Sequence, residues 1–197
     1  MHRVVVIGGS CSGKTTVARR LAEILDVPHI ELDALHHDPN WNEAPAEVLR
    51  ERLTVALAAA PEGWVVDGNY FGKLRGFQVE QADTVVSLDV PYRTAIRRVL
   101  WRTFSRLVTR AELWNGNRER LRDTFGRNSI VLWVLRTHPG FRKKWMERLR
   151  AYPHVDVVHL HSAREANAWL QSIQAAAEMS GSSSVSDRQN TPPLTER

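Results

Sequence analysis

The sequence predicts an α/β protein in which a five-stranded parallel sheet is covered by helices on both faces, a three-layer α/β/α arrangement. Short β-branched runs alternate along the chain with longer segments of helical periodicity. These runs are apolar rather than alternating, which is typical of parallel strands buried on both faces. The expected strands are residues 3–7, 29–32, 64–67, 84–90 and 155–160.

Helices are expected wherever apolar residues recur three and four positions apart. The first begins near Lys14 and ends before Pro28, and the second begins at Pro45 and ends before Pro61. A long helix follows Pro91, which stops the preceding strand. The apolar positions that define these helices are Val17, Leu21, Ile24, Leu25, Leu49, Leu53, Ala56, Leu57, Ala60, Ile96, Val99, Leu100, Phe104 and Leu107.

The last part of the chain carries less regular signals. Residues 111–127 are polar and are expected to form loops or short helical pieces. Helices are expected around 128–137 and 141–151. Ser162 and Glu165 form a capping box, which predicts that a final helix begins there.

Length and composition fit one globular domain over residues 1–178, followed by a tail over 179–197 that loses all periodicity and is expected to be disordered. No apolar run is long enough to span a membrane. A single cysteine cannot form an intrachain disulfide, so the cytoplasm is the expected compartment. The net charge is +5, but residues 91–150 hold 16 Lys or Arg against four acidic residues, which indicates an anionic partner.

The segment from Gly8 to Thr15 matches the phosphate-binding pattern G-x-x-x-x-G-K-[ST] at every required position. A glycine-rich turn between a strand and a helix points backbone N–H groups at phosphate oxygens, and the helix adds its dipole. Lys14 would reach the β- and γ-phosphates, and the Thr15 hydroxyl would bind Mg²⁺. Cys11 could be alkylated in this loop, although a small space-filling side chain is the simpler interpretation. The expected cofactors are ATP and Mg²⁺, and the expected binding residues are Gly8, Gly9, Ser10, Cys11, Ser12, Gly13, Lys14, Thr15 and Thr16.

Together with this loop, a second segment makes the chain resemble the adenylate kinase-like small-molecule kinases of the P-loop class. Residues 64–70, Trp-Val-Val-Asp-Gly-Asn-Tyr, are similar to that family's apolar strand with its following Asp-Gly and substrate-side loop. The resemblance implies that Asp67 orders the Mg²⁺ shell and that the substrate lies near Asp67, Asn69 and Tyr70. The family's usual Pro-Arg after Asp-Gly is replaced here by Asn69 and Tyr70.

Leu88-Asp89-Val90-Pro91, followed by Arg98 and Arg102, is similar to the strand that leads into that family's lid. The resemblance implies a lid over about 98–127, with one arginine against adenine and the other on phosphate. A closer similarity is to the bacterial FlaR-like or DNA topology modulation proteins, which are themselves adenylate kinase-like. The shared residues are Leu32-Asp33-Ala34-Leu35-His36, Pro39-Asn40-Trp41, Asp67-Gly68-Asn69-Tyr70 and Leu113-Trp114-Asn115-Gly116-Asn117-Arg118-Glu119.

Asp33 lies at the end of the second expected strand, where sheets of this topology open their ligand crevice. Glu31 and Asp33 resemble the acidic pair of shikimate kinases, and residues 33–40 resemble a segment of the gluconate kinases. In both families the second acid holds an acceptor hydroxyl. Asp33 would then orient the hydroxyl and take its proton as the oxygen attacks phosphorus. The alternative is that Asp33 only caps the following turn.

Four arginines recur every four residues along the long helix, namely Arg98, Arg102, Arg106 and Arg110. Like charges at this spacing destabilise an isolated helix by about 0.2–0.5 kcal/mol per pair, and no acidic residue separates them. An anion over the helix would relieve the repulsion, so we expect Arg98 and Arg102 to bind the triphosphate. Arg118 and Arg122 are expected to reach the phosphates as the lid closes.

The sequence therefore favours an ATP-dependent phosphotransferase that acts on a small-molecule acceptor, either a nucleoside or nucleotide or a small polyol or sugar acid, as a monomer or homodimer. The expected catalytic residues are Lys14, Asp33, Arg98, Arg102, Arg118 and Arg122. The alternative is a nucleotide-dependent DNA-binding regulator that uses the basic segment. No helix-turn-helix or basic zipper signature supports it, so no nucleic acid partner is expected.

Other signals have plainer interpretations. A GTPase would require an Asn-Lys-x-Asp signature, which does not occur in the chain. Zinc is not expected at His36 and His37, because adjacent side chains point in different directions. Trp101 and Trp114 lie among the arginines and could stack on bases, but packing in the core or lid is expected instead.

Overall fold

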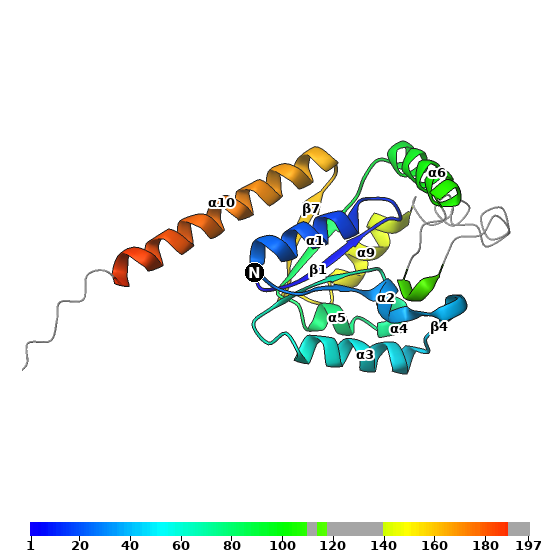
Figure 1. Cartoon of the computed structure of the whole chain (residues 1–197), viewed down its shortest axis with the longest axis horizontal. Coiled ribbons are helices and arrows are strands. Elements are labelled where there is room, and N and C mark those ends of the chain that lie inside the picture. The colour runs from blue at the N-terminus through cyan, green and yellow to red at the C-terminus, as the bar shows by residue number, and fades with distance from the viewer. Residues whose placement is uncertain (110–113, 118–139, 189–197) are drawn as a thin grey trace, which may run out of the picture.

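The computed structural model describes residues 1–109, 114–117 and 140–188. Its central sheet has five parallel strands in the order β2-β5-β1-β6-β7, with helices on both sides (Figure 1). The predicted fold class is confirmed. The strands are β1 (Arg3–Gly8), β2 (His29–Glu31), β5 (Trp64–Asp67), β6 (Thr84–Leu88) and β7 (Asp156–Leu160).

The two faces of β1 fill two separate cores. Val4 and Val6 pack with α1 (Lys14–Leu25) and α10 (Ala163–Arg188) on one face. Val5 and Ile7 pack with α3 (Ala46–Ala58), α5 (Phe77–Glu80) and α9 (Phe141–Leu149) on the other. All four side chains are fully buried, as expected for a strand covered on both faces. A further long helix, α6 (Tyr92–Thr109), follows β6 in the chain.

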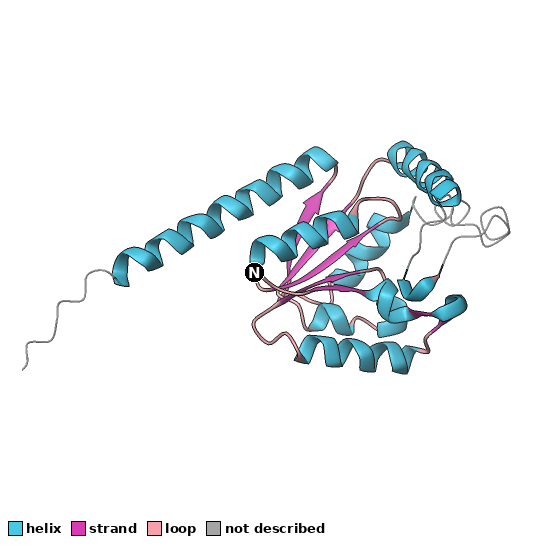
Figure 2. Cartoon of the chain, in the orientation of Figure 1, coloured by secondary structure: helices cyan, strands magenta, loops and turns pink. Residues whose placement is uncertain are grey.

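Short elements cluster at the carboxyl ends of β2 and β5, as Figure 2 shows. The second strand ends at Glu31, one residue before the predicted end, because Leu32 begins a one-turn helix. A two-stranded antiparallel ribbon, β3 (His37–Asp38) paired with β4 (Asn42–Glu43), follows that helix and was not predicted. These elements are α2 (Leu32–His36), β3 (His37–Asp38), a 3-10 turn (Pro39–Trp41), β4 (Asn42–Glu43), α4 (Phe71–Leu74) and a second 3-10 turn (Trp114–Gly116).

The last helix begins at the predicted capping box and continues further than expected. The Ser162 hydroxyl accepts the backbone N–H of Glu165 at 3.1 Å, and the Glu165 carboxylate accepts the backbone N–H of His161 at 2.9 Å. The sequence predicts a disordered tail after residue 178, whereas α10 continues to Arg188 and extends away from the sheet in Figure 1. The rest of that predicted tail, 189–197, lies outside the described residues.

The predicted helix around 128–137 and two parts of the predicted lid, 110–113 and 118–127, also lie outside the described residues. Within the ranges that the structure describes, none of the helices combines the length and the apolar content that a bilayer crossing requires.

Candidate functional site

The turn between β1 and α1 has the backbone conformation of a phosphate-binding loop. Cys11 and Gly13 adopt positive φ angles of 61° and 100°. Left-handed residues in a short turn are typical of backbone concavities that bind anions through N–H groups. Gly8 is required by a close approach, since a Cβ there would lie 2.6 Å from Ser12 Oγ and 2.7 Å from the Leu88 carbonyl oxygen.

The N-terminus of α1 is open to an anion. No side chain caps it, and its first turn contains no acidic residue. The Lys14 ammonium folds back across the loop and donates to the Gly9 carbonyl oxygen at 3.5 Å. The start of a helix dipole and an ammonium group therefore lie at the same turn, which contains Ser10 and is followed in α1 by Thr16.

Thr15 and Asp67 meet beside this loop. The Thr15 hydroxyl donates to Asp67 Oδ2 at 2.5 Å, while the other carboxylate oxygen, Oδ1, is buried with no hydrogen-bond partner among the described residues. Burial raises the pKa of Asp67, with Lys14 opposing the shift and Asp33 adding to it. An orphaned carboxylate oxygen next to a threonine hydroxyl is suited to the hydration shell of a Mg²⁺ ion, which prefers oxygen ligands.

Asn69 joins the phosphate loop to the segment after β5. Its side-chain amide contacts Gly8 at both ends, accepting the Gly8 N–H at 3.2 Å and donating to the Gly8 carbonyl at 2.5 Å. The Asn69 side chain thus pairs with the backbone of Gly8 as a neighbouring strand would, and holds the residue at which the loop begins. Its predicted contact with substrate stays a prediction.

Helix α6 lies over the phosphate loop. Arg98 donates to the carbonyl oxygens of Cys11 and Ser12 at 3.4 and 3.1 Å. With Arg97 and Trp101, Arg98 also lines an open hollow of about 360 Å³. Trp101 is 71% exposed, so it does not pack in the core, and its packing in the lid stays a prediction.

The other predicted arginines are less well placed by the structure. Arg102 is half-buried one turn after Arg98. The side chain of Arg106 is not described, and Arg110, Arg118 and Arg122 lie outside the described residues.

Asp33 and Tyr70 meet across the carboxyl ends of β2 and β5. The Tyr70 hydroxyl donates to Asp33 Oδ1 at 2.6 Å. Burial raises the pKa of Tyr70 far above its usual value, and the neighbouring Asp33 adds to the shift, so the phenol stays protonated as a donor. The N-cap of α2 is Glu31 and not Asp33, so the capping alternative for Asp33 is not what the structure shows.

A second cluster of charges lies behind Tyr70 and had no role in the sequence prediction. The Lys73 ammonium is 3.0 Å from His36 Nε2 and donates to Glu43 at 2.8 Å. The His36 ring is 3% exposed and contacts the Tyr70 ring edge-on at 4.7 Å. Burial lowers the pKa of His36, and Lys73 lowers it further, so His36 is neutral at pH 7.

Glu31, the first acid of the predicted pair, is engaged by three neighbours. The Trp114 indole N–H donates to it at 2.7 Å, and Arg19 and His29 lie 3.6 and 3.8 Å away. The packing expected for Trp114 is therefore present in the structure. The sequence could not predict that this indole reaches Glu31, since the two residues are 83 positions apart in the chain.

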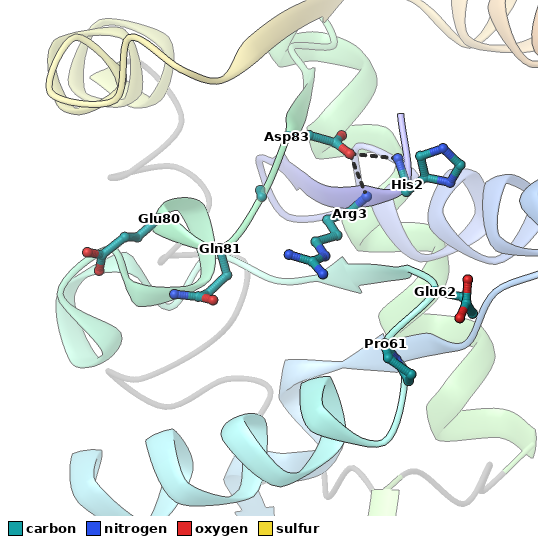
Figure 3. Close-up of a pocket in the computed structure, with 8 residues that line it drawn as sticks. His2, Arg3, Pro61, Glu62, Glu80, Gln81 and Asp83 are labelled. Carbon is teal, nitrogen blue, oxygen red and sulfur yellow. Dashed lines mark hydrogen bonds between the residues drawn. The ribbon is translucent and has the colours of Figure 1, made fainter.

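A different hollow, of about 480 Å³, lies at the amino ends of β1, β5 and β6, away from the phosphate loop (Figure 3). Its clearest feature is Asp83, which accepts the backbone N–H groups of His2 and Arg3 at 2.7 and 3.0 Å. Although burial opposes the shift, these bonds and one from Thr84 hold the pKa of Asp83 below its usual value. We interpret this cluster as a structural link between β1 and the start of β6, because ligands in such sheets bind at the carboxyl ends of the strands.

Comparison with known proteins supports the fold. Shikimate kinase from Bacteroides thetaiotaomicron superimposes with a TM-score of 0.52 at 15% identity, over 90% of this chain and 98% of that one. Shikimate kinase from Acinetobacter baumannii, in complex with shikimate, gives 0.51 at 17% identity, over 95% and 94%. No protein-family model matches the sequence, and neither does any curated protein. At these identities the similarity establishes the architecture, so the chain has the fold of the shikimate kinases.

Proposed function

We propose that this protein is an ATP-dependent phosphotransferase, a P-loop kinase that transfers the γ-phosphoryl group to a hydroxyl of a small molecule. The observation that carries the proposal is the pairing of Thr15 with Asp67 beside the uncapped start of α1. Asp67 pairs in register with Glu31 of the neighbouring strand, so Asp33 lies only two residues further along. The nucleotide loop and the Asp33–Tyr70 pair thus open on the same edge of the sheet.

Residues of the loop would bind and orient the nucleotide. Backbone N–H groups of the loop after Gly8 would hold the β-phosphate, and Lys14 would neutralise the β- and γ-oxygens. Thr15 and Asp67 would hold Mg²⁺, whose charge supports phosphoryl transfer when the ion is bound. Arg98 lies close enough to the loop to exchange its carbonyl partners for phosphate oxygens or to lie against the base.

Asp33 would act on the acceptor. Tyr70 holds Oδ1 of the carboxylate, which orients Oδ2 for a substrate hydroxyl. As the hydroxyl oxygen attacks the γ-phosphorus, the bond from phosphorus to the bridging oxygen breaks and ADP leaves. The hydroxyl proton passes to Asp33, and the electron pair of the broken bond stays on ADP.

The acceptor class rests on weaker support than the reaction class. A nucleoside or nucleotide and a small polyol or sugar acid are both compatible with the site, and one structural neighbour was solved with shikimate, a small hydroxylated acid. That neighbour favours the polyol and sugar-acid class. Membership of the FlaR-like group, a cytoplasmic location and a monomeric or homodimeric state remain predictions from the sequence.

The test is phosphoryl transfer from Mg·ATP to a panel of nucleosides, nucleotides, polyols and sugar acids, with ADP release and product mass as readouts. We expect one acceptor class to raise turnover well above the rate of the Lys14→Ala variant. If no acceptor does so, the kinase proposal is wrong. No observation on the described residues favours the DNA-binding alternative.

A further inference from the structure

The short turn at residues 114–117 makes contacts that the kinase proposal leaves unexplained. It follows α6 in the chain but docks on the opposite side of the site, against residues 32–43. Asn115 donates to the carbonyl oxygens of Ala34 and His37 at 3.2 and 2.6 Å. Asn117 is 4% exposed and contacts the same segment at Asp38 and Trp41. We refer to residues 32–43 as the 32–43 segment and to residues 114–117 as the 114–117 turn.

Asn117 supports a strained piece of backbone. Asn40 and Trp41 have consecutive positive φ angles of 63° and 59°, and such a conformation is uncommon for an aromatic residue. The Asn117 side chain accepts the Trp41 N–H at 2.8 Å and donates to the Asp38 carbonyl at 3.0 Å. One amide therefore replaces the backbone pairing that this tight turn cannot provide for itself.

Trp114 extends the contact to the strand that leads to Asp33. Its indole N–H donates to Glu31, and its ring stacks on His37 with centroids 6.2 Å apart and planes inclined by 26°. The 114–117 turn thus contacts both the strand that precedes Asp33 and the segment that follows it.

The same stretch of chain also contacts the nucleotide loop. Arg98 of α6 donates to two loop carbonyls and precedes Trp114 by 16 positions in the chain. An anion bound in the loop would compete for the Arg98 guanidinium, so nucleotide binding would act on the same stretch of chain that carries the 114–117 turn.

We propose that Asn117, with Asn115 and Trp114, are positioning residues that make the order of the 32–43 segment, and hence the placement of Asp33, depend on the bound nucleotide. This inference rests on the proposed function, because it requires a nucleotide in the loop. By linkage, an acceptor held by the 32–43 segment would strengthen nucleotide binding by the same factor.

The test measures hydrogen exchange by mass spectrometry on the full chain, with and without saturating Mg·AMP-PNP. In the unaltered protein the nucleotide should slow exchange in the 32–43 segment by about fivefold, at the lower end of typical coupling between sites. In the Asn117→Ala and Asn115→Ala variants this slowing should vanish, while protection of the phosphate loop and the Kd for AMP-PNP stay within about twofold.

Asn42→Ala is the matched control. Asn42 lies in the same segment and donates to the Pro39 carbonyl at 3.0 Å, so its loss breaks a hydrogen bond within the segment and none to the 114–117 turn. Trp114→Phe keeps an aromatic ring, though a smaller one, and removes the bond to Glu31. This variant is the test should Asn117→Ala fail to fold, and we expect it to reduce the slowing at least twofold.

Three outcomes are distinguishable. If AMP-PNP does not bind, the proposed function fails and the inference fails with it. If AMP-PNP protects the phosphate loop without slowing exchange in the 32–43 segment, only the inference is overturned. The same holds if the slowing survives in Asn117→Ala, or survives in full in Trp114→Phe.

Discussion

The two halves of the site are built by different means. On the nucleotide side, the turn from Gly8 to Thr15 presents backbone N–H groups, and its shape comes from the positive φ angles of Cys11 and Gly13. On the acceptor side, the 32–43 segment is held by side chains from distant parts of the chain, as the bonds of Tyr70 to Asp33 and of Asn117 to Trp41 show.

The difference matters for what each half tolerates. A backbone loop keeps its ligands when a neighbouring side chain changes, so long as its glycines remain. A surface assembled from side chains loses shape with each partner removed, and a buried partner left unpaired adds its desolvation cost of about 1–3 kcal/mol. We therefore expect the nucleotide half to fail only at a few positions and the acceptor half to weaken gradually at many.

The strongest test compares two lysines. Lys14→Ala should lower kcat by about 10³-fold, because it removes positive charge from the transferred phosphoryl group. Lys73→Ala, on the acceptor side, should change kcat less than about tenfold and act mainly on the acceptor KM. Steady-state kinetics with thermal unfolding as a folding control checks both. A similar loss of kcat in the two variants would contradict the division into two halves.

A second comparison separates Asp33 from its partner. Asp33→Asn keeps a group that accepts the Tyr70 hydroxyl but cannot take a proton, so kcat should fall by about 10²-fold or more. Tyr70→Phe leaves the carboxylate in place and should cost only about tenfold. The rates of phosphoryl transfer decide between the roles, and equal losses would mean that Asp33 only binds the acceptor.

A third substitution probes the backbone requirement. Gly8→Ala should lower the free energy of unfolding by about 2 kcal/mol, since its Cβ would overlap Ser12 Oγ and the Leu88 carbonyl. Gly72→Ala is the control, because no atom lies within 4 Å of the Cβ it would add. Urea unfolding measures both, and a neutral Gly8→Ala would show that the loop relaxes readily.

A fourth test uses the buried carboxylate on the nucleotide side. Because burial raises the pKa of Asp67, the folded state favours its protonated form, and stability is lost as pH rises through that raised pKa. Asp67→Asn should therefore raise the Tm by about 2 °C at pH 7.5, less at pH 5, while reducing activity with Mg·ATP. A lower Tm at pH 7.5 would contradict the assigned cause.

The smallest expected effect is on the acceptor side. Because the pKa of His36 is lowered, the unfolded chain binds a proton that the folded state does not, so stability falls as pH drops below about 6.5. His36→Gln should reduce the loss of unfolding free energy between pH 7.5 and 5.5 by about 1 kcal/mol. His154→Gln, which replaces an exposed histidine and not a buried one, is the control.

The same division explains what the sequence could predict. The phosphate loop and the strands follow from contiguous residues, because a glycine spacing or an apolar run acts on its own neighbourhood. Asp33 could be singled out from its place at a strand end. The partners Lys73 and Asn117 could not, since they lie 37 and 76 positions from the groups they hold.

Trp114 to Asn117 were singled out from the sequence only as part of a run that resembles a protein group, a resemblance that stays a prediction, and the run alone assigns no contact. The extension of α10 past residue 178 was missed for another reason. Ser and Gly residues there have low helix propensity, and propensity is a weak guide where a helix is already propagating from a packed segment.

Cys11 has a consequence for anyone who handles this protein. It is the chain's one thiol, and its half-buried side chain packs against the buried cluster of Val90, Ala95 and Val99. A maleimide dye attached there would mark a single known atom at the junction of turn and helix. The added bulk would push the turn away from the cluster of Val90, Ala95 and Val99, so the label would perturb the site as well as report on it. Its rate of attachment should fall when nucleotide fills the turn.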